Sequence, residues 1–413
     1  RLNAEGKTKS DIGREAFEEE VWNWKKVSGN KITSQLRRLG SSLDWSSERF
    51  TLDEEYQHAV LSAFIQLFEE GLIYQGKRLV NWDPVLETSL SDLEVLNKDL
   101  TIKIWEIKYQ LEATDEFVIV ATTRPETLLG DMALAVNPSD KRFSHLIGKK
   151  ASLPLCNRLI PIVADSYVDP EFGTGVVKIT PGHDFNDYDL GKRHGLHMDE
   201  DMQCHTGTEA DFMPISILNK TVEVIGVAPK KFHGMDRFEA RKVILEDLKK
   251  DKFLVSEKEY ESTLPYGDRS DQILEPLLTD QWYVDAKTLA KPAIEAVKRG
   301  EIQFVPTNWE KTYFQWMNNI QDWCVSRQLW WGHRIPIWYD ESNKPHAGFS
   351  EKDVRERHNL KGKLRQEEDV LDTWFSSSLW TFATMGWPKK NEKLSLFHPT
   401  TTLVTGFDII FFW

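Results

Sequence analysis

The chain has 413 residues, of which 40% are hydrophobic and 28% charged, and its formal net charge is -13. This length predicts two or three domains with a sizeable core. No apolar run reaches the roughly 18 residues that a membrane helix requires, so we expect no membrane-spanning segment. The acidic balance is weak evidence against a polyanionic partner, because phosphate contact depends on local Lys and Arg patches.

The three cysteines are Cys156, Cys204 and Cys324, and no pair has CxxC spacing. This pattern argues against a disulfide framework and against a cysteine-ligated zinc site. A reducing, cytoplasmic location fits it best.

The first 75 residues show helical spacing. Residues 11–26 predict a helix that stops before Gly29, and Thr51 with Glu54 predicts a capping box that opens a second helix, ended by Gly71. We interpret the apolar stripe of the second helix as core: Ala59, Val60, Ala63, Phe64, Leu67 and Phe68.

The middle third changes to the spacing of strands. Residues 105–111 alternate between apolar and polar side chains, and 117–120 form a continuous apolar run that predicts a buried strand. Helical spacing returns at 236–250 and 287–299. The pattern therefore predicts an all-β block inserted into an α/β protein. The other strand-like runs are 159–163, 175–180 and 222–227.

Two polar segments follow predicted strands in this block. The first, Thr122-Thr123-Arg124-Pro125-Glu126-Thr127, places hydroxyls and a guanidinium at a strand end, where Pro125 restrains the backbone. An ordinary turn with a hydroxyl cap is the alternative interpretation.

The second segment spans residues 173–187. Alternation puts Lys178 and Thr180 on one face of a strand, and the turn beyond adds Asp184 and Asp187. A lysine near two carboxylates can stabilise an oxyanion, while a carboxylate binds an ammonium group or orients water.

A divalent-metal hydrolase is an alternative, because His183, His194 and His197 lie near these carboxylates in the sequence. Their spacing matches none of the recognised zinc patterns, and Lys178 adds positive charge where a metal site prefers anions. We therefore predict no metal site. The sequence also has no evident Ser/His/Asp nucleophile set and no phosphate-binding glycine loop.

The segments ATTRPETLLGD (121–131) and GTGVVKITPGHDFNDYDLGKRHG (173–195) resemble the editing domain inserted into class I valyl-tRNA synthetases. Flanking segments extend the resemblance over nearly the whole chain: RRLGSSLDWSSERFTLD, GKRLVNWDP, DWCVSRQLWWGHRIPIWY, EDVLDTWFSSSLW and VTGFDIIFFW. The resemblance implies an α/β fold with a Rossmann-type catalytic core, incomplete here, interrupted by a β-rich, β-barrel-like editing domain.

The implied domain boundaries divide the chain into five segments. The catalytic core would comprise residues 1–75 and 310–413, the stem of the insertion 76–108, the editing domain 109–257 and the return stem 258–309.

The resemblance also implies roles for individual residues. The implied catalytic residues of editing are Thr123, Lys178, Asp184 and Asp187, and the implied substrate-binding residues of the editing pocket are Arg124, Thr127, Phe172 and Thr180. The implied wall of a valine-binding pocket comprises Trp374, Asp408, Ile409 and Trp413, for which core packing is the alternative.

We hypothesise that Asp187 holds the threonyl ammonium or hydroxyl group. Lys178 and Thr180 would fix the terminal ribose or carbonyl. Arg124 would hold the adenosine or phosphate, and Phe172 would stack on the terminal base. Water would attack the ester without a metal, another cofactor or a covalent intermediate.

The parent protein implied by the resemblance is a monomeric, cytoplasmic valine-tRNA ligase. It would use ATP with Mg to charge tRNA(Val) through valyl-adenylate. A valine pocket admits threonine, because an apolar wall penalises one hydroxyl only modestly, so a second site has to hydrolyse Thr-tRNA(Val). Neither the HIGH nor the KMSKS motif occurs in the sequence. We therefore expect this chain to carry editing but not valine activation.

Two alternatives stay open. The chain belongs to an isoleucyl enzyme if it hydrolyses Val-tRNA(Ile) instead. It is a catalytically silent tRNA-binding module if it binds misacylated tRNA without turnover.

Overall fold

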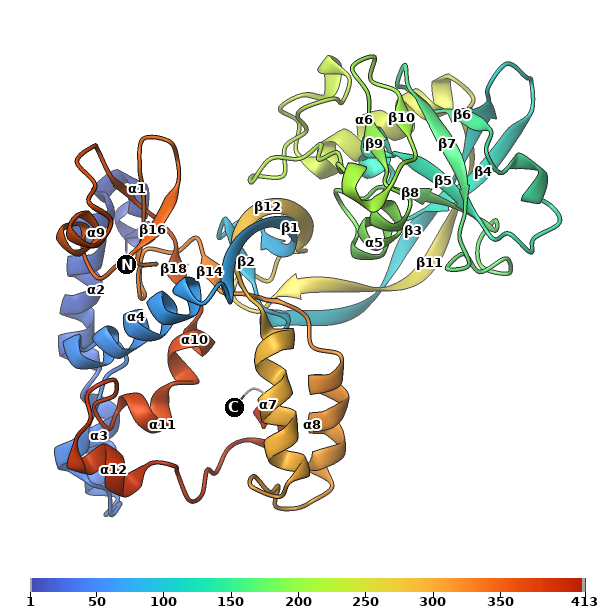
Figure 1. The fold of residues 1–413 in the computed structure, drawn as a ribbon. Coiled ribbons are helices and arrows are strands. Elements are labelled where there is room, and N and C mark those ends of the chain that lie inside the picture. Colours follow the sequence, from blue (N-terminus) through green and yellow to red (C-terminus); the bar gives the residue numbers. More distant parts are fainter. Residues whose placement is uncertain (1, 411–412) are drawn as a thin grey trace. The chain divides into compact units, whose positions relative to one another are not determined.

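The computed structural model describes residues 2–410 and 413. The chain divides into two compact units (Figure 1): unit 1 comprises Arg1–Gly76 and Gln281–Trp413, and unit 2 comprises Lys77–Asp280. An insertion within a discontinuous unit is the arrangement that the sequence pattern predicts. The finer division into two stems and an editing domain stays a prediction.

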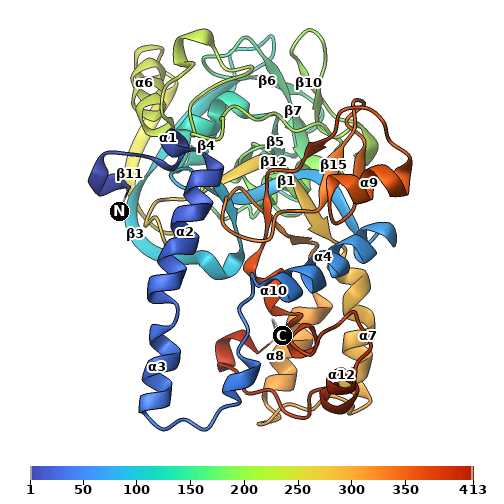
Figure 2. The same ribbon diagram turned by 90° about the vertical axis from the view of Figure 1, so that its left-hand side faces the viewer.

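The N-terminal helices of unit 1 are interrupted by a glycine. α1 (Lys9–Ile12) and α2 (Arg14–Ser28) meet at Gly13, whose φ of 79° is left-handed, and α3 (Lys31–Arg38) continues in nearly the direction of α2 (Figure 2). The helix expected over 11–26 is thus confirmed, with a break near its start.

α4 (Glu54–Glu69) forms the centre of the core of unit 1. Its N-cap is Asp53, whose carboxylate accepts from the Tyr56 N–H at 2.8 Å, so the predicted Thr51 capping box is wrong. An acceptor directly before the first helical residue reaches the free N–H groups of the first turn, and Asp53 is better placed for this than Thr51. Four residues of the expected stripe are buried and the last two, Leu67 and Phe68, are partly buried against the same core. Phe64 packs against Trp282 and Phe375.

The rest of unit 1 mixes short strands and helices. β12 (Glu275–Val284) pairs with β13, and the other strand pairs are β14–β18, β15–β16 and β15–β17; all four pairs are antiparallel. The Rossmann-type arrangement stays a prediction. The helix expected over 287–299 is confirmed as α7 (Ala286–Lys298). The remaining elements are α8 (Trp309–Asn318), β13 (Trp323–Cys324), β14 (Ser326–Arg327), β15 (Ile337–Tyr339), β16 (Pro345–Ala347), α9 (Glu351–His358), β17 (Arg365–Gln366), β18 (Val370–Leu371), α10 (Thr373–Ser377), α11 (Trp380–Ala383) and α12 (Glu392–Phe397).

Unit 2 is built on a curled β half-barrel. Its seven-stranded sheet has the order β11-β3-β6-β7-β5-β8, with β4 paired to β3 (Figure 1). β5 and β7 are parallel, whereas β5 and β8 are antiparallel. The strands of this sheet are β3 (Val95–Leu111), β4 (Phe117–Thr122), β5 (Ala133–Val136), β6 (Lys150–Ser152), β7 (Leu159–Ala164), β8 (Val176–Ile179) and β11 (Leu254–Gly267). Outside it, β9 (His197–Met198) pairs with β10 (Cys204–His205), and β2 (Thr88–Leu90) pairs with β1 (Ile73–Asp83).

Two long strands carry the chain from one unit to the other, β1 (Ile73–Asp83) and β12 (Glu275–Val284). Unit 2 also contains α5 (Phe185–Arg193) and α6 (Arg237–Lys250), the second of which confirms the helix expected over 236–250. The 3-10 helices of the chain are η1 (Asn3–Glu5), η2 (Trp45–Ser47), η3 (Asp92–Glu94), η4 (Pro125–Gly130), η5 (Ser144–Leu146), η6 (Glu209–Asp211), η7 (Lys230–Phe232) and η8 (Phe407–Ile409).

Two strand predictions in unit 2 need correction. Residues 222–227 form isolated bridges at Glu223 and Val224 instead of a strand, because Val222 and Gly226, with φ values of 57° and 71°, interrupt the extended backbone on either side. β4 exists, but it is not buried throughout: its burial alternates along the strand, and Phe117 is exposed. One face of β4 therefore lies outside the core.

In residues 2–410 and 413, no helix is both long and apolar enough to cross a bilayer.

Candidate editing site

The two polar segments meet around the ammonium group of Lys178. Its Nζ donates to Thr127 Oγ1 at 3.0 Å, to Asp131 Oδ1 at 3.2 Å and to Thr180 Oγ1 at 2.5 Å. The antiparallel register of β5 and β8 brings this about, since it pairs Leu134 with Lys178 and so places Asp131 near Thr180. The expectation that Lys178 and Thr180 share a face is confirmed.

Asp131, which binds this ammonium group, is fully buried. Its Oδ1 also accepts from Thr180 Oγ1 at 2.6 Å, and its Oδ2 accepts from the buried Tyr109 hydroxyl at 2.7 Å. Burial raises the pKa of Asp131, whereas the Lys178 charge and the hydrogen bonds from Thr180 and Tyr109 oppose the rise. We call Tyr109, Thr127, Asp131, Lys178 and Thr180 the lysine cluster.

The two predicted aspartates stand at the start of α5. Asp184 is the N-cap: its Oδ1 accepts from the backbone N–H groups of Asn186 at 2.9 Å and Asp187 at 3.0 Å. Asp187 accepts from the Thr180 N–H at 2.8 Å through Oδ2. Burial and the neighbouring Asp184 charge raise the pKa of Asp187 to about 7, against the lowering effect of Lys178. Asp187 therefore titrates near neutral pH.

A glycine makes the turn before α5 possible. A Cβ atom on Gly182 would stand 2.0 Å from the carbonyl oxygen of Ile215. Because that oxygen belongs to the backbone, a larger residue would have to displace the chain at this point. Gly182 thus allows the His183–Asp187 turn to pack closely on the neighbouring loop.

Arg124 lies in a separate network of charges. Its guanidinium donates to the His183 carbonyl oxygen at 2.8 Å, contacts Glu126 at 3.4 Å and forms an ion pair with the fully buried Glu275. Glu275 also accepts from Arg237 at 2.7 Å. Burial would raise the pKa of Glu275, but Arg124 and the other cationic neighbours hold it well below its usual range. Arg124 therefore links the first segment to the turn of the second.

His183 completes the same network. Its Nε2 accepts from the Ile217 N–H at 3.0 Å, so the proton lies on Nδ1, which faces Glu275 Oε1 at 3.3 Å. Burial lowers the pKa of this imidazole. Both ring nitrogens are thus bound within the protein. Across the described part of the chain, no three His, Cys, Asp or Glu side chains are arranged to hold a metal ion.

Phe172 and Thr123 stand apart from the lysine cluster. Phe172 lies in the loop between β7 and β8, and 59% of it is exposed. Thr123 follows β4 and is partly exposed. The Phe172 ring is accessible to a flat ligand, and its predicted stacking role stays a prediction.

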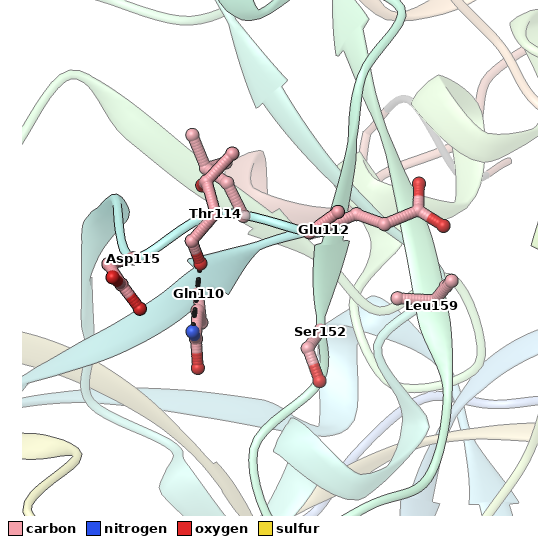
Figure 3. A pocket seen from close by; sticks show the side chains of 8 residues that line it. Gln110, Glu112, Thr114, Asp115, Ser152 and Leu159 are labelled. Carbon is pink, nitrogen blue, oxygen red and sulfur yellow. Dashed lines mark hydrogen bonds between the residues drawn. The ribbon is translucent and has the colours of Figure 1, made fainter.

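A surface hollow of about 440 Å³ lies at the turn between β3 and β4 (Figure 3). The turn is closed by a hydrogen bond from Gln110 Nε2 to the Thr114 carbonyl oxygen, 2.9 Å long. No predicted site residue lines this hollow, whose lining comprises Gln110, Leu111, Glu112, Ala113, Thr114, Asp115, Ser152 and Leu159. It gives no support to the predicted chemistry.

The residues predicted for a valine pocket lie in unit 1. The rings of Trp374 and Trp413 meet edge to face, with centroids 5.5 Å apart and an angle of 74° between their planes. Asp408 and Ile409 lie on η8, where Asp408 is exposed. The structure thus brings the two tryptophans together, and the pocket assignment stays a prediction.

The sequence matches one family model, "tRNA synthetases class I (I, L, M and V)", over residues 1–413. The chain belongs to the class I tRNA synthetases. Three curated relatives named "Valine--tRNA ligase" are similar to this synthetase chain. The protein from Legionella pneumophila (strain Paris) is 56% identical over 415 residues, which is 100% of this chain and 43% of the relative. That from Francisella tularensis is 53% identical with the same coverage, and that from Coxiella burnetii is 54% identical over 97% of this chain and 42% of the relative.

The synthetase chain spans less than half the length of these curated relatives. A solved ternary complex of Agrobacterium radiobacter K84 LeuRS with tRNA and LeuAMS matches 88% of this chain and 48% of that chain. Its sequence identity is 16% and its TM-score is 0.33. The family membership therefore rests on the sequence matches.

The sequence analysis missed several residues that organise the site of this synthetase chain. Asp131 ends the first quoted segment, so a signal for it was present. Glu275 stands about ninety residues beyond the second segment, and nothing local marks it as a partner of Arg124. The other missed residues are Tyr109, Glu126, Arg237 and Arg241, the last of which binds Glu126 at 2.8 Å.

Proposed function

We propose that the whole protein is a valine-tRNA ligase and that unit 2 hydrolyses mischarged Thr-tRNA(Val). The ligase part is supported by the names of relatives that are 53% to 56% identical to this chain. The editing part is supported by the chemistry of the lysine cluster and of Asp187.

One observation carries the editing proposal: a dense set of buried polar groups adjoins the carboxylate of Asp187, whose Oδ2 accepts from the Thr180 N–H at 2.8 Å. A site that separates threonine from valine has to recognise a hydroxyl group positively. Valine leaves the polar partners of such a site unsatisfied, which costs free energy because those partners are buried. An apolar pocket would give the opposite preference.

We assign different roles to Asp187 and Lys178. The ionised form of Asp187, which is substantially populated near its pKa of about 7, is the form that holds the threonyl ammonium group. Lys178 already donates to three internal acceptors, so it acts as a fixed positive charge beside the reacting ester. Water adds to the ester carbonyl, and the tRNA ribose oxygen leaves and takes up a proton.

Arg124, Thr127 and Thr180 orient this site. Arg124 is held by Glu275 and by the His183 carbonyl oxygen, and it fixes the turn that carries Asp184 and Asp187. The Arg124 side chain, which is 28% exposed, and the Phe172 ring would meet the terminal nucleotide, while Thr123 and Asp184 would shape the loop and the helix start.

Valine activation belongs to the whole protein in this proposal. ATP with Mg would supply the adenylate chemistry there, and the HIGH and KMSKS motifs do not occur among the 413 residues. Trp374, Asp408, Ile409 and Trp413 would line the valine pocket. The remaining parts of the proposal are tRNA(Val) as partner, the cytoplasm as location and a monomeric state.

Deacylation of Thr-tRNA(Val) tests the editing proposal, with Val-tRNA(Ile) and Val-tRNA(Val) as comparison substrates. We expect turnover of Thr-tRNA(Val) alone and at least about a hundredfold loss in Lys178→Ala and Asp187→Ala. Glu257→Gln, a surface change in the same unit, is the control and should leave the rate unchanged. Unchanged rates in both site variants would remove the assignment.

Two other outcomes would select an alternative. Turnover of Val-tRNA(Ile) in place of Thr-tRNA(Val) would indicate the isoleucyl enzyme, and binding of Thr-tRNA(Val) without turnover would indicate a silent module. Valylation of tRNA(Val) by the whole protein tests the ligase part.

A further inference from the structure

Helix α6 carries two arginines one turn apart, and each of them binds a different buried carboxylate. Arg237 donates through Nη1 to Glu275 Oε2 at 2.7 Å. Arg241 donates to both oxygens of Glu126, each at 2.8 Å. Glu126 and Glu275 are 1% and 0% exposed. Because residues four apart lie on one face of a helix, a single face of α6 anchors both carboxylates.

Arg124 lies between these two carboxylates. Its Nη2 forms an ion pair with Glu275 Oε1, and its Nε lies 3.4 Å from Glu126 Oε1. Positive and negative charges therefore alternate through five side chains, which we call the arginine network: Arg241, Glu126, Arg124, Glu275 and Arg237.

The Arg124 guanidinium keeps donors for a ligand. Of its five N–H groups, three have acceptors, which are Glu126, Glu275 and the His183 carbonyl oxygen. The part of the chain that the structure describes offers no acceptor to the other two, and the side chain is 28% exposed. Since three contacts fix the plane of the guanidinium, the two remaining N–H groups have a fixed direction.

The two carboxylates also stabilise the charge of Arg124 at this position. Burial alone would lower the pKa of the guanidinium, but the charges of Glu275 and Glu126 outweigh burial and raise it. Removal of one carboxylate would leave a largely buried cation with an incomplete set of partners, which is costly. The guanidinium would then turn toward other acceptors.

The arginines of α6 are separate from the lysine cluster. Among residues 2–410 and 413, Arg237 donates to Glu275 and to the carbonyl oxygens of Ile273 and Leu274, and Arg241 donates to Glu126. Neither arginine shares a hydrogen bond with a member of the lysine cluster in this range. An effect of α6 on the site therefore has to pass through the carboxylates and Arg124.

We propose that Glu275 and the two arginines of α6 are positioning residues for Arg124. They fix its guanidinium in the direction in which it binds the terminal nucleotide of the tRNA. This inference deepens the proposed editing function and rests on it. Because the effect passes through Arg124, it disappears when the Arg124 side chain is removed.

The test is a double-mutant cycle of Glu275→Gln and Arg124→Ala in the full chain, assayed by deacylation of Thr-tRNA(Val). Glutamine keeps the size of the side chain and removes its charge. We expect Glu275→Gln alone to lower kcat/KM by about tenfold or more, because a small displacement of a binding group is costly. In the Arg124→Ala background, the same change should alter kcat/KM by less than about twofold.

The cycle separates positioning from a general loss of folded protein. A smaller folded fraction lowers the rate by the same factor whether or not Arg124 is present. Glu239→Gln removes an exposed carboxylate from α6 and should leave kcat/KM unchanged in both backgrounds. Equal losses from Glu275→Gln in the two backgrounds, or no loss in either, would overturn the proposal.

Arg241→Gln is the second variant, and it decides the outcome if Glu275→Gln does not fold. It removes the paired hydrogen bonds to Glu126 at a side chain that is 25% exposed. We expect kcat/KM to fall by about threefold with Arg124 present and to stay unchanged in Arg124→Ala. Lys242→Gln, at the exposed neighbouring position, is its control and should change neither. An unchanged kcat/KM in Arg241→Gln, or an equal loss in both backgrounds, would overturn the positioning role.

The unmodified chain distinguishes failure of this inference from failure of the editing function. If it deacylates Thr-tRNA(Val) and the two substitutions act independently, only the positioning role fails. If it does not deacylate Thr-tRNA(Val) at all, the editing function itself fails, and the positioning role fails with it.

Discussion

The lysine cluster of unit 2 and the predicted valine pocket of unit 1 differ in how fully their polar groups are buried and hydrogen-bonded within the protein. Every polar group of the lysine cluster has a buried partner, and Asp131 lies at its centre with both oxygens bound. In unit 1, Asp408 is exposed and Trp413 is 41% exposed. A substitution in the lysine cluster should therefore lower both activity and stability, whereas a substitution of Asp408 should change activity with little effect on stability.

The largest effect on stability is expected for Lys178→Met, which leaves Asp131 buried without its cation. Breaking a buried pair by removing one partner costs about 3–5 kcal/mol, so we expect a loss of that order in the free energy of unfolding. Urea unfolding measures it. The matched control is Lys103→Met, whose partner Glu257 is 42% exposed and for which we expect at most about 1 kcal/mol. Equal losses in the two variants would contradict the comparison.

An intermediate effect that depends on pH is expected for Asp187→Asn. The folded-state pKa of about 7 is above the ordinary value of 3.8, so the folded protein retains a proton that the unfolded chain releases between these values. The wild-type protein should therefore lose stability as pH rises from about 4 to 7, by roughly 2–4 kcal/mol, and the variant should not.

Unfolding measured at pH 4, 6 and 8 tests this expectation, with the variant becoming the more stable protein at pH 8 while its deacylation is lost. A difference between the two proteins that stays constant with pH would show that Asp187 does not titrate as described.

The smallest effect on stability is expected for Asp408→Asn. An exposed substitution changes the free energy of unfolding by about 0.5 kcal/mol or less. In the whole protein, the same change should raise the KM for valine in valylation by roughly tenfold, because it removes a charge from the proposed pocket. A large loss of stability together with an unchanged KM would assign Asp408 to packing instead.

The sequence predicted the parts of the structure that depend on local periodicity. The helix over 236–250 was predicted within one residue, because its apolar spacing and its cap at Asp236 lie within one short segment. Alternation also placed Lys178 and Thr180 on one face of β8. The strand predicted over 222–227 is wrong because Val222 and Gly226 have positive φ values, which interrupt the extended backbone at both ends of this segment.

The predicted site residues were separated by the fold into groups with different partners. Arg124 was grouped with Lys178 in one pocket, yet its guanidinium pairs with Glu275, at the start of a strand about 150 residues away. Such a pairing depends on tertiary folding, and no short-range pattern predicts it. The family resemblance predicted roles for individual residues, whereas the hydrogen-bond partners of those residues are seen only in the structure.

All three N–H donors of Lys178 have acceptors within the protein, which has a consequence for ligand design. An anionic head group aimed at this lysine would have to replace an internal acceptor before gaining a new one. A cationic group placed near Asp187 meets a carboxylate with one oxygen bound to the Thr180 N–H and with its charge available above about pH 7. Inhibitors of this site should therefore be amines, and their affinity should increase with pH until the amine itself loses its proton.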